Sequence, residues 1–225
     1  MATVSVRASA PPQRAQRKQQ DLIERLIDVF LREGFMELSI DDMARRLRCS
    51  KTTIYGVAAS KQQVIAVVVR GFFRRATERV EQQIQVVDAA STERIRAYLM
   101  AIAAELAPAS PEFFADLDAY APTREIYLEN TRIAGERLQG IILEAVPAAS
   151  QSEALFIGSV AANVMNAIHR GEIESVAGLD DSAAYRALAR LIVAGVEASA
   201  SAPLDAGPID AVPLDAVEFE PGSDR

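Results

Sequence analysis

The chain has 225 residues, 50% of them hydrophobic, which is enough for a helical domain of ordinary size with a small appendage. Its one cysteine, Cys49, excludes an internal disulfide framework and fits a reducing compartment. The polar residues 1–20 lack the apolar stretch of a secretory signal, and no run approaches the roughly 20 apolar residues that span a bilayer. The composition therefore predicts a soluble, cytoplasmic protein without a membrane partner.

The net charge of −7 is unevenly distributed along the chain. Through Lys61 there are 11 basic and 7 acidic residues, whereas the remainder holds 13 basic and 24 acidic ones. Because exposed charges are screened beyond about 10 Å at moderate salt, a basic segment attracts phosphate even when the whole chain is acidic. A basic N-terminal part on an acidic body is compatible with nucleic-acid binding, although chance asymmetry explains the same counts.

The pattern along the chain predicts an all-α fold, because helix formers dominate and no period-2 run is bounded by turn residues. The first predicted helix covers residues 17–33, and Gly34 suits its C-terminal end. Ser39 can cap a short helix that carries apolar residues at helical spacing. Ser50 can cap another short helix, which reaches about Val57.

The helices that follow begin at similar start signals. Ser60 and Gln63 form a capping-box pattern, and Ser150 and Glu153 form a second one. Pro111 occupies a first helical turn, where its missing N–H costs nothing. The expected ranges are 60–87, 92–107, 122–146, 150–171 and 181–199, with one more helix starting at Pro111. The sequence therefore predicts about nine helices.

Residues 39–64 carry the main functional signal. Two short helices joined by a tight turn and braced by a longer preceding helix have the form of a helix-turn-helix. Small Ala44 lies where the second helix must cross the first closely. The second helix exposes Lys51, Thr52 and Thr53 near its N-terminus, and their donors suit base edges and phosphates in a major groove. A helical hairpin alone is weak evidence, because many helical bundles contain one.

The same segment resembles the DNA-binding domain of the TetR family of repressors over about residues 20–66. Residues 50–55 follow the family's Ser-Lys-x-Thr-Leu-Tyr run, with Ile54 in place of leucine. Ser60-Lys61 matches the Ser-Lys pair that opens the family's fourth helix. Further matches upstream are Gly34-Phe35, Ser39-Ile40 and Ala44.

The resemblance implies a one-component transcriptional regulator, a repressor that binds a palindromic operator in double-stranded DNA as a dimer and is released by a small-molecule effector. It implies no cofactor. The expected DNA-binding residues are Ser39, Ser50, Lys51, Thr52, Thr53, Tyr55 and Lys61, with Arg17 and Lys18 in an arm before the first helix. A packing role for Tyr55 and a merely solvated charge for Lys61 stay open, and a plain flexible terminus explains the arm residues equally well.

Three residues depart from the family pattern. Arg48 stands at the turn where the family usually has glycine, and a left-handed conformation there would cost on the order of 1 kcal/mol. Val57 and Ala58 replace an aromatic or histidine followed by phenylalanine, which removes one phosphate contact and one aromatic anchor. The alternative function is therefore an all-α ligand-binding or scaffold dimer with weak or lost DNA binding.

Two apolar helices near the C-terminus are expected to form the dimer interface, since members of the TetR family pair through their last two helices. Residues 150–170 are apolar nearly all round and include small residues that permit close helix approach. Two such helices per chain can make an isologous four-helix interface. The expected interface residues are Ala154, Gly158, Ala161, Ala162, Met165, Ala184, Leu188, Leu191 and Gly195. Burial of both helices inside one monomer is the alternative.

The middle of the body supplies a candidate effector pocket. Asn163 and Asn166 interrupt an apolar helix, so their amides need partners, which a ligand or a neighbouring helix can provide. The candidate pocket residues are Met100, Phe113, Phe114, Tyr120, Tyr127, Phe156, Asn163 and Asn166, with a plain core role open for each aromatic. His169, near a helix end, is interpreted as a C-terminal cap. One histidine and one cysteine, far apart in the sequence, give no His/Cys metal site.

The sequence contains no Gly-rich phosphate loop, no His-Glu-x-x-His and no G-x-S-x-G, so an enzyme is not expected. The expected domains are residues 1–16 as a flexible basic arm, 17–66 as the DNA-binding domain, 67–199 as the ligand-binding and dimerisation domain, and 200–225 as a tail. In the acidic tail, Pro203, Pro208 and Pro213 recur at a five-residue step, which predicts disorder. A partner-binding tail is the alternative.

Overall fold

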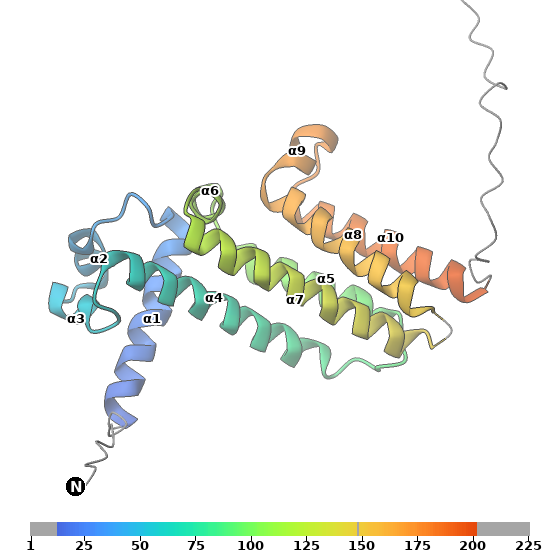
Figure 1. Cartoon of the computed structure of the whole chain (residues 1–225), viewed down its shortest axis with the longest axis horizontal. Helices are drawn as coiled ribbons and strands as arrows, with labels where there is room; N and C mark the ends of the chain where they lie inside the picture. Colours follow the sequence, from blue (N-terminus) through green and yellow to red (C-terminus); the bar gives the residue numbers. More distant parts are fainter. Residues whose placement is uncertain (1–12, 148, 202–225) are drawn as a thin grey trace, which may run out of the picture.

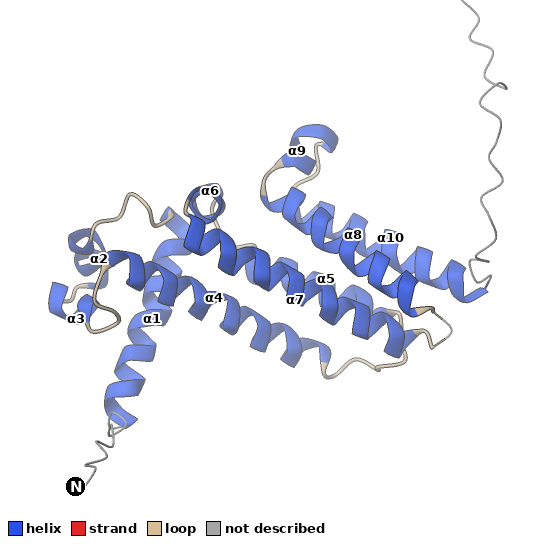
Figure 2. Cartoon of the chain, in the orientation of Figure 1, coloured by secondary structure: helices blue, strands red, loops and turns tan. Residues whose placement is uncertain are grey.

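The computed structural model describes residues 13–147 and 149–201, and all regular secondary structure in this part of the chain is α-helical (Figure 2). Its ten helices are α1 (Gln13–Glu33), α2 (Ile40–Leu47), α3 (Lys51–Tyr55), α4 (Lys61–Ile84), α5 (Glu93–Leu106), α6 (Pro111–Ala119), α7 (Ala121–Ala145), α8 (Gln151–His169), α9 (Glu172–Ala177) and α10 (Asp181–Ser201). The all-α fold class is confirmed, and each of the nine expected helices has a counterpart. Residues 1–12 of the expected arm and residues 202–225 of the expected tail lie outside the described residues.

Two features differ from the sequence-based expectation. α1 begins at Gln13, so Arg17 and Lys18 lie exposed on a helix and not in an arm before it. The short helix α9 was not expected, because none of its six residues is buried and it therefore leaves no apolar period. Gly171 and Gly178 flank α9 with φ values of 70° and 65°, a backbone conformation that glycine adopts readily.

The helices form a small N-terminal unit and a longer helical body (Figure 1). The N-terminal unit consists of α1, α2, α3 and the start of α4, and α4 continues from it into the body. There α4 packs on α5 and α7, α8 packs on α7, and α10 packs on α5 and α8. Within the described part of the chain, no helix combines the length and the apolar character that crossing a membrane requires.

Two apolar cores follow one another along α4. The first core joins α1, α2 and α3 to the part of α4 that ends at Phe73, and it includes Phe113 and Leu117 of α6. The second core begins on α4 at Val80 and continues through α5, α7, α8 and α10. Since α6 comes from the expected body yet packs in the first core, apolar packing continues across the expected domain boundary at residue 66.

The backbones of α7 and α8 approach closely at two glycines. A Cβ atom on Gly158 would lie 2.7 Å from the carbonyl oxygen of Gly135, and one on Gly135 would lie 3.0 Å from the carbonyl oxygen of Gly158. Ala154 and Ala161, at the same face of α8, are fully buried. The small residues expected at a dimer interface therefore mediate packing between two helices of one chain, because only small side chains allow this approach.

The turn between α2 and α3 contains a non-glycine residue in the left-handed region. Arg48, at the C-cap of α2, has φ 52° and ψ 47°, and it has the only positive φ of a non-glycine residue in the described part of the chain. Its side chain is exposed. The backbone geometry therefore favours glycine at this position, and glycine is the residue that the TetR family usually has there.

We expect Arg48→Gly to raise the free energy of unfolding by up to about 1 kcal/mol, because it removes the left-handed penalty while increasing the entropy of the unfolded chain. Urea unfolding followed by circular dichroism measures the change. The matched control is Arg45→Gly, at an exposed position inside α2, which should lose about 1 kcal/mol. A loss of stability for Arg48→Gly would contradict the prediction.

Candidate nucleic-acid interface and internal cavity

Serine side chains cap the helices of the N-terminal unit. The Ser39 hydroxyl accepts a hydrogen bond from the Asp42 backbone N–H at 3.1 Å, and the Asp42 carboxylate accepts one from the Ser39 backbone N–H at 3.0 Å. These bonds form a complete capping box. Hydrogen bonds from the Ser39 hydroxyl and backbone lower the pKa of Asp42 to about 2. Ser50 caps α3 in the same manner by accepting from the Thr53 N–H at 3.1 Å.

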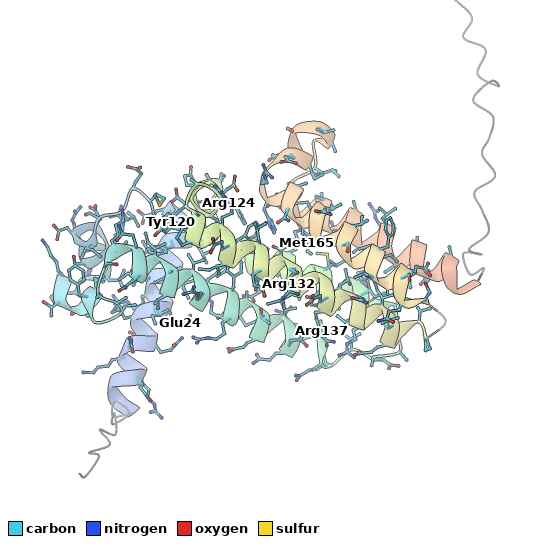
Figure 3. The ribbon with its side chains drawn as sticks, viewed as in Figure 1. Glu24, Tyr120, Arg124, Arg132, Arg137 and Met165 are labelled. Atoms are coloured by element: carbon cyan, nitrogen blue, oxygen red, sulfur yellow. The ribbon has the colours of Figure 1, made fainter. Side chains whose placement is uncertain are left out.

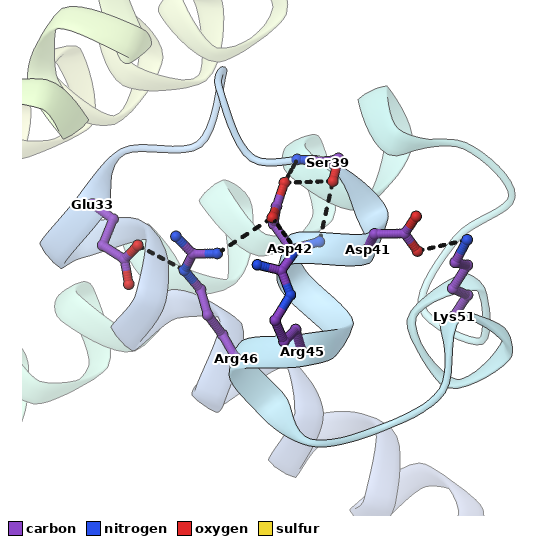
Figure 4. A network of polar contacts seen from close by, with 7 residues as sticks. All are labelled: Glu33, Ser39, Asp41, Asp42, Arg45, Arg46 and Lys51. Carbon is purple, nitrogen blue, oxygen red and sulfur yellow. Dashed lines mark hydrogen bonds and ion pairs between the residues drawn. The ribbon is translucent and has the colours of Figure 1, made fainter.

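Charged side chains connect α2 to its two neighbouring helices (Figure 4). Arg46 contacts Glu33 of α1 at 2.7 Å and Asp42 at 3.8 Å. Lys51, the first residue of α3, forms an ion pair of 2.6 Å with Asp41. Because these side chains are partly or largely exposed, each pair contributes at most about 1 kcal/mol. The pairs orient α2 and α3 without fixing them rigidly.

The outer surface of α3 is available to a partner. Ile54 is fully buried and anchors α3 on the first core. Lys51, Thr52 and Thr53 are exposed, and the side chain of Tyr55 is 47% exposed. The structure therefore brings four of the expected DNA-binding residues together on one short helix with an outward face.

The other expected DNA-binding residues lie around this helix. Lys61, half-buried at the start of α4, donates a hydrogen bond from Nζ to the carbonyl oxygen of Met36 at 2.6 Å. It is therefore not a merely solvated charge. Arg17 and Lys18 lie on the exposed surface of the N-terminal part of α1. The next residue of that helix, Gln19, donates from Nε2 to the carbonyl oxygen of Gly56 at 3.1 Å, which connects α1 to the end of α3.

The residues that depart from the expected pattern after Tyr55 pack inward. Val57 is 9% exposed and belongs to the first core, and Ala58 packs against that core. These two small apolar side chains stand where the TetR family has an aromatic residue or histidine followed by phenylalanine. The end of α3 is thus anchored by packing, without the phosphate contact whose loss the sequence indicated.

The body contains a partly open cavity of about 160 Å³ between α4, α5, α7, α8 and α10. Arg137 of α7 and Met165 of α8, labelled in Figure 3, are two of the residues in its wall. Most of the surface that faces the cavity belongs to apolar atoms, although many of the lining residues also carry a polar group. The polar lining residues are Thr77, Glu81, Tyr98, Glu105, Tyr127, Asn130, Thr131, Arg137, His169 and Tyr185.

A histidine between two tyrosines forms one side of the cavity. The Tyr127 hydroxyl lies 2.8 Å from Nδ1 of His169, and the Tyr185 hydroxyl lies 2.9 Å from Nε2. Burial lowers the pKa of His169 to about 4, so its imidazole is neutral near pH 7. Burial also raises the pKa of Tyr127 and of Tyr185. The three groups therefore form an uncharged hydrogen-bonded chain, and the interpretation of His169 as a helix cap missed this role.

The structure distributes the eight expected pocket residues over several environments. Tyr127 lines the cavity, and Met100 lines a smaller hollow of about 150 Å³ that shares His169 and Tyr185 with it. Phe113 is buried in the first core, and Tyr120 packs against that core near the α6–α7 corner. Phe114 does not line the cavity but stacks on His169. Phe156 and Asn163 are exposed and lie outside it. Asn166 also lies outside it, and its buried Oδ1 has no hydrogen-bond partner in the described structure.

Sequence reasoning did not find most of the cavity wall. Tyr98, Asn130 and Arg137 lie on helices whose apolar faces gave no indication of a cavity between them. The only available signal was Tyr185, a large side chain with a polar group among alanines of the last helix. A buried tyrosine needs a hydrogen-bond partner, and that need pointed to a polar neighbour such as His169.

Four large apolar side chains of α8 and α10 are exposed. The side chains of Leu155, Phe156 and Val160 on α8 are 54%, 69% and 37% exposed, and that of Leu191 on α10 is 69% exposed. Of the expected interface residues, Leu191 and Gly195 lie exposed. The buried ones are Ala154, Gly158, Ala161, Met165, Ala184 and Leu188, and Ala162 is half-buried beside Gly135. The two expected helices thus present an apolar face, but mostly through their larger side chains.

The short helix α6 connects the cavity to the end of α1. The carboxylate of Asp116 accepts hydrogen bonds from the backbone N–H groups of Phe35 at 2.5 Å and Met36 at 2.9 Å. The preceding Gly34 has φ 70°, and a Cβ there would lie 2.6 Å from Asp116 Oδ2. From the same helix, Phe114 stacks on His169 with ring centroids 4.8 Å apart. One helix therefore contacts both the turn after α1 and the cavity histidine.

Among residues 13–147 and 149–201, no three His, Cys, Asp or Glu side chains lie close enough together to hold a metal ion. Cys49 is half-buried and is not in a disulfide. The carboxylates near the start of α7 have other partners, since Asp118 pairs with Arg124 at 3.3 Å. The described residues thus offer an exposed face on α3 and a cavity in the body, and they contain no such cluster.

Solved structures of other proteins have the same arrangement of helices, although sequence comparison finds no match. No model of a known protein family matches the sequence, and no curated protein matches it either. Among solved structures, a TetR-like transcriptional regulator from Rhodococcus sp. RHA1 has a TM-score of 0.56 at 16% identity, covering 84% of this chain and 99% of its own.

Two further solved structures have a similar fold. A transcriptional regulator of the TerR/AcrR family from Aquifex aeolicus has a TM-score of 0.53 at 16% identity, covering 80% of this chain and 98% of its own. A TetR family transcriptional regulator from Thermus thermophilus has a TM-score of 0.51 at 18% identity, covering 77% of this chain and 97% of its own. Since these chains align over nearly their whole length, the protein has the fold of TetR-like regulators, both in its helix-turn-helix and in its helical body.

Proposed function

We propose that the protein is a one-component transcriptional regulator that binds double-stranded DNA as a homodimer and is released when a small molecule occupies the cavity. The observation that carries this proposal is the outward face of α3, where Lys51, Thr52, Thr53 and Tyr55 are exposed around the buried anchor Ile54. The three similar structures, all of them transcriptional regulators, support the same function. Release by an effector makes the protein a repressor.

The chemistry of α3 suits contact with a DNA duplex. A major groove admits one helix, and hydroxyl and ammonium groups can donate hydrogen bonds to base edges and phosphates. Lys51 must leave Asp41 to reach DNA, and this exposed ion pair is weak enough to exchange for a phosphate contact. Lys61, held by the carbonyl oxygen of Met36, is placed beside the helix-turn-helix as a fixed positive charge.

The open face of α8 and α10 supports a homodimer. Large exposed apolar side chains on two neighbouring helices are the kind of surface that a protein partner covers. A two-fold axis through this face brings two copies of the same patch together, as an isologous interface requires. Two recognition helices held about 34–36 Å apart read the two halves of a palindromic site, so dimerisation also supplies sequence selectivity.

The connection through α6 supports release by a cavity ligand. A ligand beside His169 changes the position of the ring on which Phe114 stacks. Phe114 contacts Phe113, with centroids 5.7 Å apart, and Phe113 contacts Phe35 at 6.0 Å. A ligand that binds better to one position of α6 therefore shifts the N-terminal unit, by differential affinity for the two arrangements.

A second function, a ligand-binding or scaffold dimer with weak or lost DNA binding, is favoured by the engagement of both nearby lysines within the chain. Lys51 is paired with Asp41, and Lys61 with a backbone carbonyl. The left-handed Arg48 and the small Val57 and Ala58 point in the same direction. DNA selection separates the two functions.

Selection from random double-stranded DNA at low salt should enrich a palindrome with the wild-type protein. Lys51→Ala/Tyr55→Ala should bind the enriched site at least tenfold more weakly, because each direct contact contributes about 1–3 kcal/mol. The matched control is Arg132→Ala, an exposed and likewise ion-paired cation on α7, which should bind as the wild type does. Absence of enrichment, or equal binding by the double variant, would favour the scaffold function.

The dimer should dissociate when the open apolar face becomes polar. Phe156→Ser/Leu191→Ser removes about 2 kcal/mol of apolar burial per side chain, twice over in a symmetric dimer, and should raise the dimer Kd at least about a hundredfold. Sedimentation velocity over a concentration series measures this. Val176→Ser, at an 89% exposed position on α9, serves as the control and should stay dimeric. A wild-type monomer at all concentrations would refute the homodimer.

The contact between α6 and the turn after α1 should depend on the carboxylate of Asp116. Asp116→Ala leaves the N–H groups of Phe35 and Met36 without their acceptor and should lower the free energy of unfolding by about 1–3 kcal/mol. Amide hydrogen exchange at these two residues should accelerate. Asp118→Ala, which removes an exposed ion pair on the same helix, should change stability by less than about 0.5 kcal/mol. Unchanged exchange in Asp116→Ala would show that this carboxylate does not hold the turn.

A further inference from the structure

The size of the cavity limits what can occupy it. Its volume is about 160 Å³. An engineered apolar cavity of about 150 Å³ holds benzene, whereas pockets for drug-sized ligands measure about 300–1,000 Å³. A ligand that fills this cavity without moving its walls is therefore a compact molecule, close in size to one six-membered ring with a small substituent.

The charged residues of the wall are already balanced. Arg137 forms two contacts with the Glu81 carboxylate, at 2.8 Å and 3.1 Å. Glu105 is paired with Arg79 at 3.5 Å. An anionic ligand meets no unpaired cation in this wall, and a cationic ligand must compete with Arg137 or Arg79 for a carboxylate. Because burying an uncompensated charge is costly, the wall favours an uncharged ligand.

The hydrogen-bonded chain around His169 leaves one donor over. A neutral imidazole has one N–H and one lone-pair nitrogen. One tyrosine hydroxyl therefore donates to the lone pair, while the N–H donates to the oxygen of the other tyrosine. The two tyrosine hydroxyls and the imidazole N–H have three protons, and the two hydrogen bonds use two of them. In either tautomer of His169, the hydroxyl of Tyr127 or of Tyr185 therefore retains a proton to donate. The neighbouring Thr131 hydroxyl already donates to the Tyr127 carbonyl oxygen at 3.0 Å.

The cavity adjoins the protein surface between α4 and α7. Phe73, Asn130 and Ile133 line both the cavity and an open groove of about 400 Å³ on that surface. Ile133 is 43% exposed, so its side chain lies at the boundary between the two. A compact uncharged molecule can therefore reach the cavity by displacing few side chains.

We infer that the cavity selects an uncharged, single-ring-sized molecule with one hydrogen-bond acceptor, such as a carbonyl oxygen, which accepts the remaining hydroxyl proton of the Tyr127–His169–Tyr185 chain. This inference names the class of the effector and in that respect rests on the proposed function. Binding of the molecule itself does not depend on DNA.

Four probes of nearly equal shape test the inference by calorimetry on the full chain. Acetophenone supplies a neutral acceptor, α-methylstyrene replaces its oxygen with a carbon, benzoate is an anion, and benzamidinium is a cation. Acetophenone should bind, α-methylstyrene should bind about tenfold more weakly for want of the hydrogen bond, and neither ion should bind. Because His169 is the only histidine of the chain, its ¹⁵N resonances should shift with acetophenone and identify the tautomer.

Variants locate the binding site. Ala134→Met fills the cavity and should abolish acetophenone binding, whereas Ala121→Met, at the exposed first residue of α7 and away from the cavity, should leave it unchanged. Preference for an ion, equal affinity for the two neutral probes, or no binding of any probe at millimolar concentration would overturn the inference. Selective acetophenone binding that leaves the affinity for an enriched operator unchanged supports the ligand class and counts against effector release. Loss of palindrome selection alone counts only against the proposed function.

Discussion

The close approach of α7 and α8 at Gly135 and Gly158 determines much of the body's architecture. Because the backbones touch there, the small residues of α8 are confined to the inside of the chain. The same inner face continues to Met165 and His169, where α7 and α8 no longer touch so closely and a cavity remains. Other large side chains of α8, such as Phe156 and Val160, are left exposed. One helix contact thus produces both an internal hollow and an external apolar surface.

The local parts of this fold could be predicted from the sequence, because their causes are local. A serine followed by a free backbone N–H three residues later determines the starts of α2, α3 and α8. The resemblance pointed to the turn at Arg48 as a place where glycine is usual, and the structure shows the left-handed backbone there. The partners of each apolar face could not be predicted in this way. Helical periodicity indicates that Gly158 and Phe156 lie on different faces, but not which face meets a neighbour.

A pocket in the body was predicted, but most of its wall escaped prediction for a related reason. A cavity is a property of several helices together, and its wall is drawn from five of them. Each wall residue looks like an ordinary core position in its own helix. His169 was misjudged because its position near a helix end suggested a local role, whereas its partners lie 42 and 16 residues away in the sequence. Aromatic residues of α6 were placed in the pocket, but they contact its histidine from outside or pack in the first core.

The uninterrupted helix α4 runs through both apolar cores. Its 24 residues span about 36 Å, and its buried side chains belong to the first core at one end and to the second at the other. If α4 tilts by one degree about its C-terminal end at Ile84, its N-terminal end at Lys61 moves by about 0.6 Å. Sub-ångström rearrangements around the cavity therefore become ångström-scale movements at the opposite end of the molecule.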